Sequence, residues 1–146
     1  MTDAAKPKPD LVVWLIAGLG LIWNLIGIFQ FIVREFGDKA QNIAAGMTPD
    51  QAEFYLHLPI WMKFAFGIGV IGGSIGCLLL VLGRKFALPV LWAALVAYIS
   101  LYLADIAYGV FEVLGSKQVT IMTMVLGIAI GLQAYAVWLG RRGRLS

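Results

Sequence analysis

The chain has 146 residues, of which 61% are hydrophobic and only 13% are charged. Its mean hydropathy of +0.89 lies above the range of soluble globular domains and excludes that class of protein. The formal net charge is +3 at neutral pH, and the positions of the basic residues decide what this excess means.

Four long apolar stretches account for most of the sequence. They cover residues 11–33, 60–82, 87–110 and 119–139. Each is close to the ~20 residues that a helix needs to cross a ~30 Å hydrocarbon layer. Because backbone groups in lipid must form hydrogen bonds within their own segment, we expect helices. The sequence therefore predicts an all-α membrane protein, a bundle of four transmembrane helices that forms a single domain over residues 11–139.

The basic residues lie mostly on one side of this predicted bundle. Seven of the eleven belong to residues 1–10, the turn 83–86 and the tail 140–146. The side richer in Lys and Arg normally faces the cytoplasm, so we expect both termini there, as short tails, with the protein in a bacterial inner membrane. The basic excess then indicates topology and contact with anionic lipid headgroups, rather than binding to nucleic acid.

One long connection, residues 34–59, separates the first two stretches on the predicted outer side. It contains the pattern of a helix start, with Thr48 as the N-cap, Pro49 as the first helical residue and Gln51 completing a capping box. The following residues mix apolar and charged side chains up to Pro59. This mixture predicts a short interfacial helix that lies along the membrane surface.

The third stretch carries Asp105, the one carboxylate placed well inside any of the four. An ionisable residue within a span is costly and often functional. Three other residues, two in this segment and one just beyond it, share its predicted helix face, within a stripe about 80° wide. They are Tyr98, Tyr102 and Glu112. Further polar residues fall at a similar depth in the other stretches, namely Asn24, Gln30, Lys63 and Thr123. We therefore expect a polar patch inside the outer half of the bundle.

Two interpretations of Asp105 compete. In the first, the carboxyl group binds a proton, a cation or a polar solute, with tyrosine hydroxyls beside it. In the second, it is a structural acid that bonds to Asn24, Thr123 or a tyrosine, or pairs with Lys63. Hydrogen bonds between helices in lipid contribute only ~0.6–2 kcal/mol each. A cavity that ends at Asp105 favours the first interpretation, and a carboxyl group sealed by its neighbours favours the second.

Glycines recur at helical spacing in the second and fourth stretches. The G-x-x-x-G pairs are formed by Gly69 with Gly73, Gly72 with Gly76, and Gly127 with Gly131. Such pairs let another backbone approach closely. They predict either packing within the bundle or a docking groove for a helix of a partner protein.

No pattern in the sequence indicates an enzyme. The motifs H-E-x-x-H and C-x-x-C do not occur. One match to G-x-S-x-G, Gly72 to Gly76, lies inside an apolar stretch predicted to be helical, whereas that motif acts on a strand-to-helix turn. His57 is the one histidine and Cys77 the one cysteine, so we expect no haem, metal or other cofactor and no disulfide.

Several local patterns together resemble a family of small four-helix proteobacterial membrane proteins that often carry the label "sugar transporter". The resemblance spans nearly the whole chain. It is carried by Trp23-Asn24 with Gly27, Met47 to Gln51, Pro59-Ile60-Trp61, Gly72-Gly73 with Gly76, Leu78 to Leu80, and Pro89. It implies a four-helix fold and, through the label, transport of a solute. An acid that often follows Gly27 in the family is absent here, where Phe29, Gln30 and Phe31 stand.

Two functions follow as expectations. The first is a non-enzymatic accessory subunit that packs onto other membrane-protein helices or onto copies of itself. The alternative is a minimal carrier of a small polar solute, in which protonation of Asp105 is coupled to movement of the solute.

Overall fold

The computed structural model describes residues 11–146, and within them the chain is helical with no strand. The predicted tail 1–10 lies outside the described residues. The elements are α1 (Leu11–Glu35), α2 (Lys39–Ala44), α3 (Pro49–Leu56), α4 (Ile60–Val81), α5 (Ala87–Ala107), α6 (Val110–Leu114) and α7 (Ser116–Arg141).

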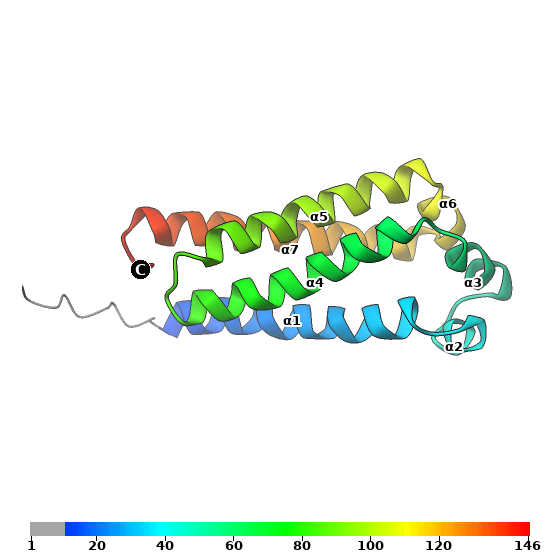
Figure 1. The fold of residues 1–146 in the computed structure, drawn as a ribbon, viewed down its shortest axis with the longest axis horizontal. Helices are drawn as coiled ribbons and strands as arrows, with labels where there is room; N and C mark the ends of the chain where they lie inside the picture. Colours follow the sequence, from blue (N-terminus) through cyan, green and yellow to red (C-terminus); the bar gives the residue numbers. More distant parts are fainter. Residues whose placement is uncertain (1–10) are drawn as a thin grey trace, which may run out of the picture.

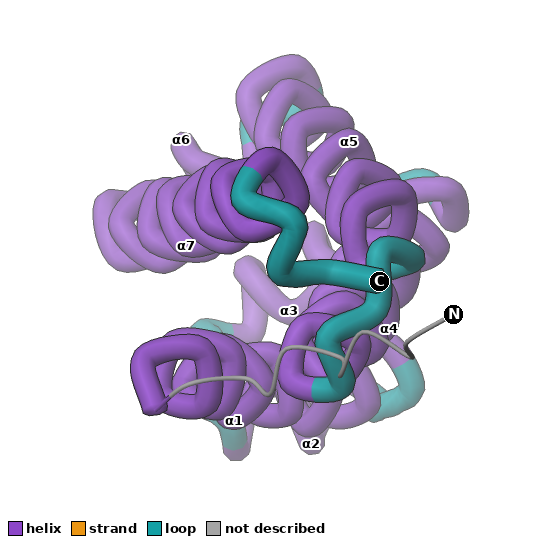
Figure 2. The backbone as a smooth tube through the Cα atoms, turned by 90° about the vertical axis from the view of Figure 1, so that its left-hand side faces the viewer, coloured by secondary structure: helices purple, strands orange, loops and turns teal. Residues whose placement is uncertain are grey.

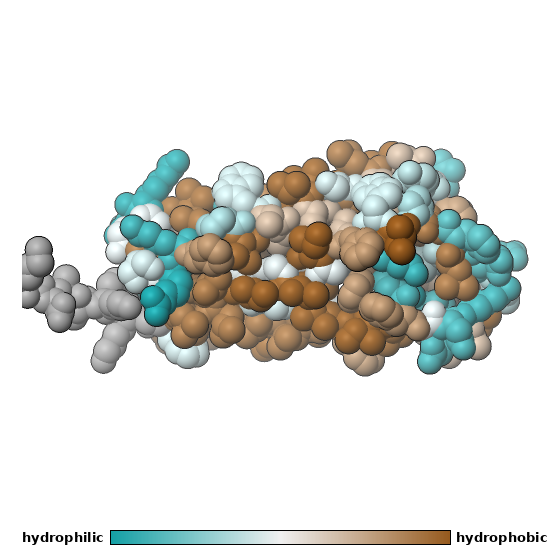
Figure 3. Space-filling model, in the orientation of Figure 1, coloured by the Kyte–Doolittle hydropathy of each residue, from teal (hydrophilic) through white to brown (hydrophobic). Residues whose placement is uncertain are grey.

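Four of these helices, α1, α4, α5 and α7, are long and apolar enough to cross a membrane. They run side by side in an elongated bundle (Figure 1). The middle of the bundle presents mostly hydrophobic surface, and the hydrophilic surface gathers toward its two ends (Figure 3). This distribution matches the prediction of four apolar spans from the sequence.

The two ends of the bundle differ in structure. We call the end that carries α2, α3 and α6 the loop end, and the opposite end, with the α4–α5 turn and the C-terminal residues, the terminal end (Figure 1). At the terminal end the chain folds back on that turn, because Ser146 N donates to Gly83 O over 2.8 Å and Lys85 N donates to Ser146 O over 3.0 Å.

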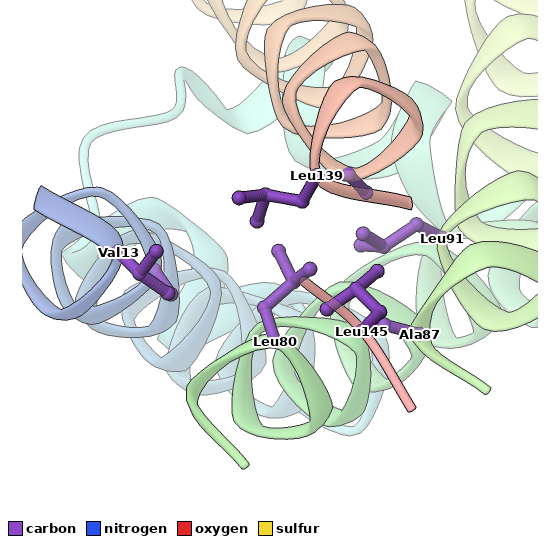
Figure 4. Close-up of a cluster of buried hydrophobic side chains, with 8 residues drawn as sticks. Val13, Leu80, Ala87, Leu91, Leu139 and Leu145 are labelled. Atoms are coloured by element: carbon purple, nitrogen blue, oxygen red, sulfur yellow. The ribbon is translucent and has the colours of Figure 1, made fainter. Parts of the chain in front are cut away.

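The fold-back buries Leu145 in an apolar cluster at the terminal end. Leu145 is 3% exposed and lies among side chains from all four long helices (Figure 4). The buried members are Val13, Ala17, Leu80, Ala87, Leu91, Ala136, Leu139 and Leu145. Packed apolar side chains therefore fill the bundle at this end.

Contact among the long helices is uneven. Helix α4 packs extensively against α1 and α5, and α5 also packs against α7, whereas α1 and α7 touch at few points. Seen along the bundle, α1 and α7 stand apart on one side (Figure 2). The space between these two helices is where the candidate site lies.

Two predicted helix boundaries are wrong, and glycines explain both. The third span ends at Ala107 instead of continuing to residue 110, because Gly109 adopts a left-handed φ of +73° that ends the helix. The short helix α6 follows, and Gly115, with φ +82°, allows α7 to begin already at Ser116 instead of at residue 119.

The connection between α1 and α4 contains two short helices. The predicted capping box of α3 is present, with Thr48 accepting from Gln51 N and the Gln51 side chain accepting from Thr48 N. A second capping box, between Asp38 and Gln41, starts α2 and was not predicted. An ion pair of 3.1 Å between Lys39 and Glu53 joins the two helices and lowers the pKa of Glu53.

Candidate functional site

A cavity of about 340 Å³ opens inside the loop-end half of the bundle. Its walls come from α1, α4, α5 and α7, and residues of α3 and the α3–α4 connection cover its outer side. The lining residues include Trp23, Gly27, Gln30, Arg34, Glu35, Tyr55, Met62, Lys63, Phe66, Val70, Tyr98, Leu101, Asp105, Lys117, Gln118, Ile121 and Val125. Its volume lies within the range of small-molecule sites in proteins.

Asp105 is the buried acid of this cavity. It lies on α5, two residues before the helix ends, and is only 3% exposed. Its Oδ2 atom is buried and has no hydrogen-bond partner among the described residues. Buried polar atoms are almost always hydrogen-bonded. Among the described residues, Asn42, Asp105 and Gln133 have such an atom without a partner, and of these three Asp105 alone lines the cavity, which makes it a candidate contact for a bound group.

The loop end of the cavity carries a set of polar contacts that join different elements. Arg34 Nη1 donates to Gln118 Oε1 over 3.4 Å and so links α1 to α7. Lys63 Nζ donates to the backbone oxygen of Glu35 over 3.4 Å. The Glu35 side chain accepts a hydrogen bond from Tyr55 of α3. These contacts fix the polar rim of the cavity.

Tyr55 keeps its proton in this arrangement. Burial raises the pKa of the Tyr55 hydroxyl well above its ordinary value, and the negative charge of Glu35 raises that pKa further. The hydroxyl therefore acts as a hydrogen-bond donor to Glu35. This bond holds α3 against the end of α1, over the cavity.

Tyr98 joins the cavity to the packed interior below it. Its ring lies against Gly69, and its hydroxyl donates to Asn24 Oδ1 over 3.2 Å. Asn24 in turn donates to Gly20 O over 2.8 Å and packs against Gly73. Asn24 is thus bonded to Tyr98 and not to Asp105, so it does not seal the carboxyl group.

The structure brings together only some of the predicted polar patch. Gln30, Lys63, Tyr98 and Asp105 line the cavity. Tyr102 and Thr123 do not line it, and instead form a contact of 3.2 Å between their hydroxyls at the α5–α7 interface.

The placement of Glu112 on the Asp105 stripe is wrong. Glu112 lies on α6 and is exposed. Its predicted position assumed one continuous helix, and the left-handed turn at Gly109 breaks the helical register between the two acids.

Several lining residues were not singled out from the sequence. They are mainly the polar residues at the rim: Arg34, Glu35, Tyr55, Lys117 and Gln118. Each lies at or beyond the end of an apolar stretch, where polar side chains are ordinary. Their approach to one another depends on how α3 folds over the bundle, and no spacing in the sequence indicates it.

The glycines of α4 take part in packing within the chain. A Cβ atom at Gly69 would overlap Tyr98, one at Gly73 would overlap Asn24, and one at Gly76 would overlap Leu91. At Gly72 it would lie 3.2 Å from the Ala94 side chain. This face of α4 is therefore occupied by α1 and α5 and is not open to a partner.

The glycines of α7 are different. Gly127 and Gly131 are exposed, and a Cβ atom at either position would meet nothing within 4 Å. These two residues lie on the outer surface of the bundle.

Comparison with protein-family models, with curated proteins and with solved structures found no match for this chain. Within residues 11–146 there is also no group of three or more His, Cys, Asp or Glu side chains that could hold a metal ion. The cavity and its lining residues are therefore the features from which a function is inferred.

The packing of the α4 glycines predicts that a leucine lowers stability there, but not at a glycine with open space around it. We expect Gly73→Leu to lower the midpoint of thermal unfolding, because the added side chain collides with Asn24 and breaks the Tyr98 contact, at a cost of about 1–3 kcal/mol. The matched control Gly18→Leu on α1 should leave the midpoint nearly unchanged, since a Cβ atom at Gly18 meets nothing within 4 Å. Equal midpoints for both variants, measured on purified protein in detergent, would contradict the packing described for α4.

Proposed function

We propose that this chain is a multi-pass membrane protein whose four long helices span a bacterial inner membrane. The hydrophobic surface of the middle of the bundle supports insertion (Figure 3). The basic residues Arg84, Lys85, Arg141, Arg142 and Arg144 all belong to the terminal end. The positive-inside rule then puts the terminal end in the cytoplasm and the loop end outside.

Within that frame, the protein binds a small solute in the cavity, with Asp105 as the principal polar contact. The observation that carries this proposal is a buried acid, Asp105, that lines a cavity of about 340 Å³ and whose Oδ2 atom has no hydrogen-bond partner among the described residues. A structural acid would have its oxygens bonded to neighbouring helices. Here Asn24 and Thr123 are bonded to tyrosines instead, and Lys63 donates to the backbone oxygen of Glu35.

Binding of this kind suits a minimal carrier. The cavity lies in the loop-end half, and the terminal end is filled by the cluster around Leu145. This asymmetry is expected of one state of an alternating-access cycle, in which the binding site is closed off from one side of the membrane. Release to the cytoplasm would then require the contacts of Leu145 and Ser146 to open.

The test is a binding assay on protein in lipid nanodiscs, with a panel of polyols, zwitterions and amines of short and long chain scored by thermal stabilisation. We expect at least one solute to stabilise the wild type, and Asp105→Asn to weaken its binding about tenfold or more, because a charge-assisted hydrogen bond is lost. The control is Asp50→Asn, an exposed aspartate outside the cavity. The same solute should enter proteoliposomes that contain the wild type.

Unaltered binding and uptake by folded Asp105→Asn would overturn the proposal. Stabilisation by no solute of the panel would also count against it.

A second candidate function is self-association or association with a partner subunit through α7. The observation that favours it is the exposed pair Gly127 and Gly131, which leaves a flat strip on that helix. This role is compatible with solute binding, since the strip does not line the cavity.

Gly131→Leu tests the second candidate. If α7 forms an interface, we expect the substitution to lower the native mass of the particle extracted with a mild detergent. Gly18→Leu on α1 is the matched control, because Gly18 also has nothing within 4 Å of its added Cβ. A native mass that is the same for wild type and both variants would exclude the α7 interface.

A further inference from the structure

We infer that the ligand of this cavity is a single-chain amphiphile, with a hydrogen-bond-donating head group at Asp105 and an apolar chain that lies between α1 and α7 and ends beside Trp23. This inference rests on the proposed function and names its substrate class. Three features of the cavity lead to it. Its lining is charged at one end and apolar at the other, it opens between two helices, and its charged groups differ in whether they already form hydrogen bonds.

The polarity of the lining changes with depth. The charged groups Arg34, Glu35, Lys63, Asp105 and Lys117 all lie near the loop ends of their helices. Toward the middle of the bundle the walls become apolar, formed by Trp23, Gly27, Phe66, Val70, Ile121 and Val125. A wholly polar solute would fit only the rim and leave the apolar depth without a matching surface.

The cavity extends far along the bundle axis. From Lys117 to Val125, α7 rises about 12 Å along its axis, and from Arg34 to Trp23, α1 spans about 16 Å. Both pairs of residues line the cavity. The site is thus an elongated slot along the helices, which has the shape of a chain and not of a compact ring or sugar.

The slot reaches the lateral surface of the bundle. Ile26 lines the cavity and is nevertheless 53% exposed, and Gln30, one turn further along α1, is exposed as well. Helices α1 and α7 are linked at the loop end by the Arg34–Gln118 hydrogen bond and stand apart beside it (Figure 2). In a membrane this side faces lipid, so the ligand enters from the bilayer.

The head group follows from the contacts at the rim. Arg34 already donates to Gln118, and Lys63 already donates to the backbone of Glu35. Glu35 already accepts from Tyr55. Asp105 has a buried oxygen that receives no hydrogen bond. At Asp105 the unmet need is for a donor, which an amine or hydroxyl head group supplies and a carboxylate head group does not. Lys117 also lines the cavity, but it is exposed at the rim, where water reaches its ammonium group.

The experiment uses decylamine brominated at the end of its chain, added to the protein in nanodiscs. Bromine quenches a nearby indole. Of the five tryptophans Trp23 alone lines the cavity, so saturable quenching that depends on Trp23 reports the position of the chain. We expect saturable quenching that unbrominated decylamine displaces and that disappears in Trp23→Phe. In Asp105→Asn the amine concentration that gives half-maximal quenching should rise about tenfold, and in Asp50→Asn it should stay unchanged.

The remaining outcomes separate this inference from the proposed function. If ethylamine stabilises the protein as well as decylamine does, and both effects need Asp105, the inference of an amphiphilic ligand is wrong, and the proposal of solute binding is retained. Tighter binding of decanoate than of decylamine would overturn the donor head group. If neither amine binds in a way that depends on Asp105, the inference and solute binding at Asp105 both fall. If Asp105→Asn does not fold, the comparison of wild type with Trp23→Phe still tests the inference. Saturable quenching that is the same in both proteins overturns the placement of the chain beside Trp23.

Discussion

The cost of burying a carboxyl group is the physical constraint on which this account depends. Asp105 is 3% exposed in a bundle with an apolar middle, and its Oδ2 atom has no hydrogen-bond partner among the described residues. Leaving such a group unsatisfied costs several kcal/mol in an apolar environment. The cavity that Asp105 lines has room for a bound molecule that would offset this cost, as the proposed function requires.

The packing of α4 makes the cavity possible. Its glycines let Tyr98 and Asn24 sit close to the helix backbone, so that α1, α4 and α5 form a tight three-helix unit. Helix α7 is held mainly by α5 and contacts α1 at few points. The bundle is therefore closely packed on one side and open between α1 and α7 on the other. The cavity follows that open side, and the cluster around Leu145 closes it at the terminal end.

The sequence predicted the helices well because hydrophobic length and capping chemistry are local properties. The four apolar stretches became four long helices, and the Thr48 capping box formed where its pattern stands. Asp105 was also found, since an acid in an apolar stretch stands out. The errors arose where a glycine chooses between continuing and ending a helix. Gly109 was read as part of a helix, and this misplaced Glu112.

The tertiary neighbours of Asp105 could not be obtained in the same way. Tyr55 and Glu35 meet through the fold of a connection of more than twenty residues, and Lys117 and Gln118 reach the cavity only because α7 begins earlier than its apolar stretch. The sequence also could not show which glycine pairs are packed and which are exposed. The α4 and α7 pairs have the same spacing, yet one set is packed inside the chain and the other is exposed.

The most direct test of the central claim is the accessibility of position 105 from the cavity. In a Cys77→Ser background, a cysteine is introduced either by Asp105→Cys or by Ala104→Cys. Ala104 is its immediate neighbour, equally buried at 4% exposed, and does not line the cavity. The account predicts that a small thiol reagent, applied to protein in nanodiscs, modifies the first variant much faster than the second. Equal protection of both cysteines would show that Asp105 is a sealed structural acid and would contradict the account.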